Sequence, residues 1–148
     1  KLVSYMHFME CFRMKRILML GVLGFGLVGC VSPMDDMLNN KFTSILPTDT
    51  SLKGFWSGNN GPYLMTYKFN GDGTGLMCYS YGTANALEKV KLANGVIYMQ
   101  DGSKQQIIKS TETDLILKVN YFGSATFRYK PDTKLINASP YCEQSLKQ

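Results

Sequence analysis

The chain has 148 residues, which is enough for one domain with its own core and too short for two. Its formal net charge is +5, but from Cys30 onward 12 Lys and Arg stand against 10 Asp and Glu, a balance of +2. These later basic residues are scattered without a run, which argues against a nucleic-acid-binding surface.

Residues 14–30 have the parts of a secretory signal. Lys15 and Arg16 form a basic start, the uncharged stretch 17–28 follows, and the segment closes on Leu27-Val28-Gly29-Cys30. These four closing residues resemble the lipobox of a bacterial lipoprotein precursor. A membrane-spanning helix needs roughly 20 apolar residues, and the uncharged stretch is shorter. An uncleaved anchor is therefore the less favoured alternative.

The resemblance to lipoprotein precursors implies a location. In that family a signal peptidase cuts before the cysteine, so residues 14–29 are the signal peptide and Cys30 carries acyl chains. Each buried methylene contributes about 0.8 kcal/mol, so two or three chains hold a protein durably on a membrane. Val31 follows the cysteine, where aspartate commonly retains lipoproteins in the inner membrane, and this favours the outer membrane of a Gram-negative cell. Residues 1–13 are interpreted as an over-extended start.

Residues 30–50 are predicted to be the lipidated cysteine and a flexible tether. They contain two prolines and polar clusters without a convincing period. Met34, Met37 and Leu38 are spaced for a single helical turn, which is the alternative for part of this segment. The working domain is predicted to comprise residues 51–148.

This domain is predicted to be all-β. In one segment Tyr63, Met65, Tyr67 and Phe69 share a face, and the residues between them point the other way. Glycine and asparagine at 71–73, 93–95 and 101–103 suit tight hairpin turns. The expected strands are 53–58, 63–70, 74–81, 87–92, 95–100, 104–109, 114–120 and 122–130. About eight short strands joined by short turns indicate a small antiparallel up-and-down barrel or a strongly curled sheet.

Two short motifs resemble the opening of lipocalin-like barrels. Gly54-Phe55-Trp56 is similar to the G-x-W motif of that family, whose tryptophan plugs one end of the barrel, and residues 69–75 are similar to its DGT-type turn. The resemblance covers the start of the domain and implies the barrel architecture. A typical lipocalin also has a C-terminal helix, which this sequence does not indicate. A roomy ligand cavity is therefore not expected.

Cys78 and Cys142 are the remaining cysteines after Cys30. An even pair in an oxidising compartment predicts a disulfide between the third strand and the C-terminal tail, with two buried thiols as the alternative. The only histidine is His7, so the domain has no histidine for a zinc site or for Ser-His and Cys-His catalysis. No cofactor, metal or enzymatic activity is predicted. Three carboxylates lie near strand ends and are interpreted as solvated: Glu88, Glu112 and Asp114.

The domain is rich in tyrosine, with eight from residue 51 onward. Tyrosine fills barrel interiors, but it also supplies rigid amphipathic contacts at binding surfaces. Tyr79 and Tyr81 share one strand face and, together with Trp56, are the candidate residues of a surface for a protein or glycan partner.

The sequence favours an envelope lipoprotein with a non-catalytic β domain that binds a macromolecular partner or supports envelope assembly. Two alternatives stay open: a carrier of small apolar ligands of lipocalin type, and an inhibitor of host lysozyme, because some lysozyme inhibitors are small lipidated barrels. The partner and the oligomeric state are not determined at this point.

Overall fold

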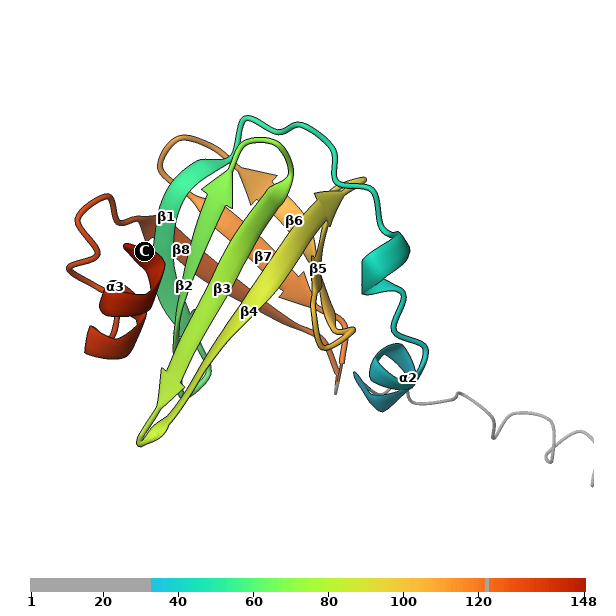
Figure 1. Ribbon diagram of the computed structural model, residues 1–148, viewed down its shortest axis with the longest axis horizontal. Coiled ribbons are helices and arrows are strands. Elements are labelled where there is room, and N and C mark those ends of the chain that lie inside the picture. Colours follow the sequence, from blue (N-terminus) through green and yellow to red (C-terminus); the bar gives the residue numbers. More distant parts are fainter. Residues whose placement is uncertain (1–32, 122) are drawn as a thin grey trace, which may run out of the picture. The chain divides into compact units, whose positions relative to one another are not determined.

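The computed structural model describes residues 33–148 except residue 122. The eight strands form one closed antiparallel barrel in which each strand pairs with the next along the chain and the last pairs with the first (Figure 1). This confirms the predicted all-β barrel and selects closure over a curled sheet. The predicted signal peptide and Cys30 lie outside the described residues.

The elements follow the chain in a simple order. They are α2 (Pro33–Leu38), the 3-10 turn η1 (Phe42–Ser44), β1 (Lys53–Asn60), β2 (Tyr63–Asn70), β3 (Thr74–Tyr81), β4 (Ala84–Ala93), β5 (Val96–Met99), β6 (Lys104–Ser110), β7 (Leu115–Val119), β8 (Ala125–Pro131) and α3 (Pro140–Leu146). Strand β4 begins three residues earlier than predicted. The sequence did not indicate this extension, because Ala84, Asn85 and Ala86 are small and show no alternation of large apolar and polar side chains. Figure 1 shows the β3–β4 hairpin reaching beyond the neighbouring strands.

The alternation of side chains along each strand builds the core. In β2, Met65, Tyr67 and Phe69 point inward and are buried. The core of the barrel is completed by Leu52, Trp56, Met77, Val90, Leu92, Ile97, Met99, Leu115, Leu117 and Tyr129. At the β2–β3 turn, Oδ1 of Asp72 accepts hydrogen bonds from the backbone N–H and the hydroxyl of Thr74, at 2.8 and 2.6 Å. The DGT segment is therefore a hairpin turn, as its sequence predicts.

Closure of the barrel relies on a close approach between β1 and β8, which pair over two residues. Gly58 lies against the backbone carbonyl oxygen of Arg128, and a Cβ atom at position 58 would overlap that oxygen. Because overpacking of this kind costs about 1–3 kcal/mol, Gly58→Ala is expected to lower the free energy of unfolding by about 2 kcal/mol. Urea denaturation measures the loss. The exposed neighbour Asn59, changed to alanine, is the control and is expected to leave the midpoint unchanged; equal midpoints for the two variants would contradict the prediction.

A C-terminal helix, which the sequence analysis did not find, packs on the outside of the barrel. Helix α3 is only seven residues long, so it shows no sustained helical period. The sequence does contain a helix-start signal, a serine at position 139 followed by Pro140. In the structure the Ser139 hydroxyl caps the helix by accepting a hydrogen bond from the backbone N–H of Cys142 at 3.2 Å. No helix in the described part of the chain is long and apolar enough to cross a membrane.

The described part of the predicted tether, residues 33–50, is folded against the barrel. Helix α2 covers the expected single turn. The backbone N–H of Thr48 donates to the carbonyl of Leu92 at 2.9 Å, and Nζ of Lys91 donates to the carbonyls of Phe42 and Ile45 at 2.9 and 2.8 Å. These hydrogen bonds from one ammonium group to several carbonyl oxygens fix the position of the segment. The described part of this stretch is therefore not a free spacer.

Candidate ligand cavity at the barrel mouth

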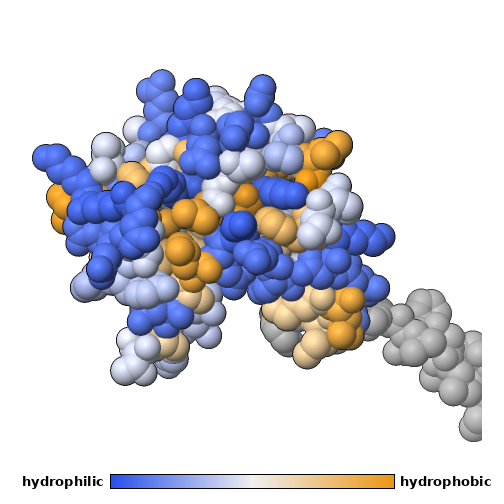
Figure 2. Space-filling view, viewed as in Figure 1, coloured by the Kyte–Doolittle hydropathy of each residue, from blue (hydrophilic) through white to orange (hydrophobic). Residues whose placement is uncertain are grey.

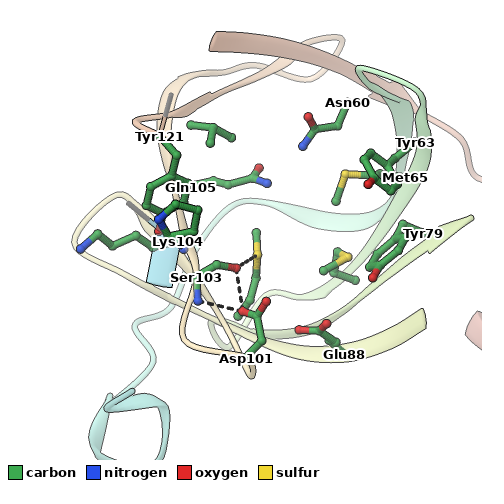
Figure 3. A pocket seen from close by; sticks show the side chains of 14 residues that line it. Asn60, Tyr63, Met65, Tyr79, Glu88, Asp101, Ser103, Lys104, Gln105 and Tyr121 are labelled. Atoms are coloured by element: carbon green, nitrogen blue, oxygen red, sulfur yellow. Dashed lines mark hydrogen bonds between the residues drawn. The ribbon is translucent and has the colours of Figure 1, made fainter. Parts of the chain in front are cut away.

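One end of the barrel carries a cavity of about 240 Å³. We call this end the mouth; it is formed by the β1–β2, β3–β4, β5–β6 and β7–β8 turns. Figure 3 shows side chains from all these segments pointing toward the cavity. Its lining residues are Pro33, Asn60, Tyr63, Met65, Met77, Tyr79, Glu88, Met99, Asp101, Ser103, Lys104, Gln105, Val119 and Tyr121. This volume lies below the 300–1,000 Å³ of typical ligand pockets.

A buried tyrosine pair in the barrel core supports Gln105, one of the residues that line the cavity. The hydroxyl of Tyr67 donates to Oε1 of Gln105 at 3.1 Å, and its ring meets that of Tyr129 edge to face, with centroids 5.2 Å apart. Burial is the main cause that raises the pKa of the Tyr67 hydroxyl well above its ordinary value, and the neighbouring Tyr129 adds to this effect. Both phenols therefore stay neutral and act as packing and hydrogen-bonding groups.

The wall of the cavity is mostly apolar and aromatic. Met65, Met77 and Met99 are buried at its sides. The rings of Tyr63 and Tyr79 meet edge to face with centroids 5.5 Å apart. Methionine side chains are flexible and polarisable, and they adapt to ligands of varied shape. The wall thus suits a small apolar chain.

Two carboxylates interrupt this apolar wall. Glu88 pairs with Met77 across β3 and β4, and its side chain points to the inside of the barrel (Figure 3). Asp101 lies in the β5–β6 turn, where its Oδ1 accepts hydrogen bonds from the backbone N–H and hydroxyl of Ser103 at 2.8 and 2.6 Å. The interpretation of Glu88 as solvated was therefore wrong: Glu88 lies on the same strand face as the buried Val90 and Leu92, and its charge and its position near the start of the predicted strand led to the wrong interpretation.

Oε2 of Glu88 is buried and accepts no hydrogen bond from any residue that the structure describes. Burial, and then the charge of Asp101, raises the pKa of the Glu88 carboxyl above its ordinary value of 4.5, although the backbone N–H of Asp101 partly opposes the shift. An ionised buried carboxylate without a full set of partners lowers the stability of the folded state.

We predict that Glu88→Gln stabilises the protein at neutral pH. In the unfolded chain the carboxyl ionises at its ordinary pKa, and in the folded chain only at a higher pH. The native state consequently binds more protons in this window, and stability falls as the pH rises from about 4.5 through the folded pKa. The glutamine variant lacks this fall, so its melting temperature should exceed that of the wild type at pH 7.5 and approach it at pH 4.

The control for this comparison is Glu112→Gln, because Glu112 is exposed in the β6–β7 turn. It is expected to melt with the wild type at both pH values. A gain in melting temperature that is equally large at pH 4 and pH 7.5 would assign the effect of Glu88→Gln to packing and not to its charge.

A contact that we call the N-terminal latch holds α2 at the edge of the mouth. Asp36 accepts hydrogen bonds from the hydroxyl of Tyr121 at 2.6 Å and from Nζ of Lys104 at 2.7 Å. Burial tends to raise the pKa of the Asp36 carboxyl, but these two donors outweigh it, so that the pKa lies below its ordinary value. Burial and the bond to Asp36 raise the pKa of the Tyr121 hydroxyl. The latch is therefore intact at neutral pH.

The structure separates the three residues that were predicted to share a binding surface. Tyr79 lies in the cavity wall, and Tyr81 is 54% exposed at the end of the β3–β4 hairpin. Tyr63 contacts both rings, at centroid distances of 5.5 and 5.3 Å. Trp56 is only 5% exposed, and its Nε1 donates to the carbonyl of Lys53 at 3.0 Å. Trp56 is thus a core residue and not part of a binding surface, because its position in β1 directs the side chain into the barrel.

The predicted disulfide between Cys78 and Cys142 is present, with 5.6 Å between the Cα atoms. It joins β3 to α3 on the outer face of the barrel. Within residues 33–121 and 123–148, no group of three or more His, Cys, Asp or Glu side chains is arranged to hold a metal ion.

Comparison with known proteins places this barrel in a family. The family model described as "Bacterial lipocalin LPS transport optimiser YedD" matches residues 39–146, a range that includes all eight strands and α3. No curated protein matches the chain, and no solved structure matches it.

Proposed function

This chain belongs to the bacterial lipocalin family of the LPS transport optimiser YedD, and from that premise we propose that it is a non-catalytic envelope lipoprotein that supports LPS transport by binding a protein of the transport pathway. The observation that carries the proposal is the family match across the whole barrel. The family's description concerns LPS transport and gives no support to the inhibition of host lysozyme.

The lipobox supports a membrane anchor for this protein. We propose residues 14–29 as the signal peptide, Cys30 as the lipidated residue, and the outer membrane as the location. Two residues lie between Cys30 and Pro33, which makes three steps along the chain, and an extended chain spans at most about 3.6 Å per step, so their Cα atoms are at most about 11 Å apart. If Cys30 is acylated, this short connection tethers Pro33, one of the residues that line the cavity, within that distance of the lipid-bearing cysteine.

The exposed aromatic edge of the mouth is the surface we propose for the protein partner. Tyr63 is 40% exposed and Tyr81 54%, and their rings are in contact. Adjacent exposed aromatic side chains are typical of the central part of protein interfaces. The projecting β3–β4 hairpin makes this edge accessible (Figure 1).

Complementation in a Gram-negative host that lacks the native gene tests the proposal. We expect the wild-type protein to restore resistance to large hydrophobic antibiotics, which well-transported LPS excludes. Cys30→Ser should abolish acylation and membrane retention, and Tyr81→Ser should impair restoration while the protein stays in the membrane. Tyr141→Ser is the matched control, because Tyr141 is a tyrosine with the similar exposure of 39% that belongs to α3 and not to the hairpin. Full restoration by Tyr81→Ser would exclude this edge as the partner surface.

The second candidate function is the carriage of a small ligand of lipocalin type. The cavity of about 240 Å³ with its three methionines is the observation that favours it. A volume of this size holds a fragment of a lipid and not a complete acyl chain.

A further inference from the structure

The cavity at the mouth contains a hydrogen-bond acceptor that the protein itself does not satisfy. Asp101 is engaged by Ser103, and Gln105 accepts from Tyr67. Oε2 of Glu88 is buried in the wall and has no donor among the described residues. A buried acceptor without a partner costs about 1–3 kcal/mol, and more when it is charged. A site that retains such a group is preorganised for a donor from outside the chain.

The charged residues around the cavity indicate which charge the donor group of a ligand should carry. Glu88 and Asp101 both line the cavity, and the one cation among the lining residues, Lys104, is paired with Asp36 through a 2.7 Å salt bridge. Figure 3 shows the two carboxylates side by side and the Lys104 side chain extending away from them. A wall with two carboxylates and a paired lysine attracts cations and repels phosphate or sulfate groups.

The remaining lining residues suit an organic cation better than a metal ion. Beside Glu88, the rings of Tyr63 and Tyr79 present aromatic surface, which attracts ammonium groups when these lie over the ring face. Met65, Met77 and Met99 supply an apolar wall for a carbon chain. Oxygen ligands sufficient for a divalent cation do not surround Glu88 in the described residues.

We propose that the mouth cavity binds an organic ammonium group attached to a short apolar chain, with the ammonium donating to Glu88 and the chain lying along the three methionines. The site holds the polar end of the ligand and a few methylenes, given its volume of about 240 Å³. The ammonium has two sources with the same chemistry: the headgroup of an amine-bearing membrane amphiphile, or a free amine. This proposal does not depend on acylation of Cys30 or on the protein partner.

Calorimetric titration of the full-length protein in a neutral sugar detergent tests the site. The probe is n-octylammonium, and n-octyl sulfate, with the same chain and the opposite charge, is the control ligand. We expect n-octylammonium to bind and n-octyl sulfate not to bind. Hydrogen bonds to charged groups contribute about 1.5–3 kcal/mol, so Glu88→Gln should weaken binding about tenfold or more. Glu112→Gln should bind as the wild type does. Partition of n-octylammonium into micelles cancels when the variants are compared in one detergent, and for each probe it is measured separately and used to correct the free concentration.

Two further measurements complete the test. Methyl resonances of Met65, Met77 and Met99 should shift on addition of n-octylammonium, while that of Met37 on α2 should not. Ethylammonium distinguishes the sources: much weaker binding than n-octylammonium assigns the site to an amphiphile, and equal binding assigns it to a free amine. Binding of n-octyl sulfate as tight as that of n-octylammonium, or unchanged affinity in Glu88→Gln, overturns the proposal. Impaired complementation by Tyr81→Ser with intact n-octylammonium binding would separate the partner surface from this cavity.

Discussion

Loss of the Cys78–Cys142 disulfide is expected to lower the free energy of unfolding by about 4 kcal/mol. The bond closes a loop across 64 residues, and the chain-entropy estimate for a loop of that length is about 4 kcal/mol. It also holds α3 on the barrel, since both cysteines are buried together with Leu135 and Leu146. The double variant Cys78→Ser/Cys142→Ser should therefore unfold at a much lower urea concentration than the oxidised wild type.

The reduced wild-type protein supplies the matched comparison. Reduction should shift its urea midpoint to that of the double variant, and the double variant should not respond to reductant. Coincident unfolding curves for oxidised and reduced wild type would show that packing of α3, and not the covalent link, provides the stability.

Asp132→Ala is expected to destabilise the protein by about 3 kcal/mol. Asp132 is 5% exposed, directly after β8. Its Oδ2 accepts from the Ser57 hydroxyl at 2.8 Å and from the backbone N–H of Asn137 at 2.9 Å, and its Oδ1 accepts from the backbone N–H of Ile136 at 2.9 Å. Each buried polar group left without a partner costs about 1–3 kcal/mol, and water reaches part of the exposed 136–137 segment. The carboxylate thus fixes the turn that leads to α3.

Asp132→Asn and Asp49→Ala are the matched controls for this effect. The asparagine keeps one oxygen acceptor and should lose less stability than the alanine. Asp49 is exposed before β1, and its loss should leave the urea midpoint unchanged. An equal loss in Asp132→Asn and Asp132→Ala would show that the charge, and not the number of acceptors, is what the turn requires.

Local patterns in the sequence were sufficient to predict the strands and most of their turns. The alternation in residues 63–70 gives the correct inner face of β2, because side chains in a strand point alternately to opposite faces whatever the tertiary context. The pairing of Cys78 with Cys142 follows because no other cysteine lies in the domain. Helix α3 was missed because two turns of helix give too little periodicity to detect.

The candidate site depended on contacts that no local pattern encodes. Asp36 and Tyr121 are 85 residues apart in sequence and meet only because α2 folds back onto the β5–β6 and β7–β8 turns. Trp56 and Tyr79 both point into the barrel, yet the first is buried in the core and the second lines the cavity, and this depends on their depth along the barrel axis.

The sequence by itself determined the strand faces, the tight turns, the disulfide partners and the resemblance to lipoproteins and lipocalins, because each of these depends on residues that are neighbours or are the only ones of their kind. The tertiary structure alone decided that the barrel closes, that Oε2 of Glu88 is buried without a donor among the described residues, and that the mouth is acidic. Closure brings strand ends from distant parts of the chain around one cavity, and the burial and charge of a side chain there depend on all of its neighbours in space.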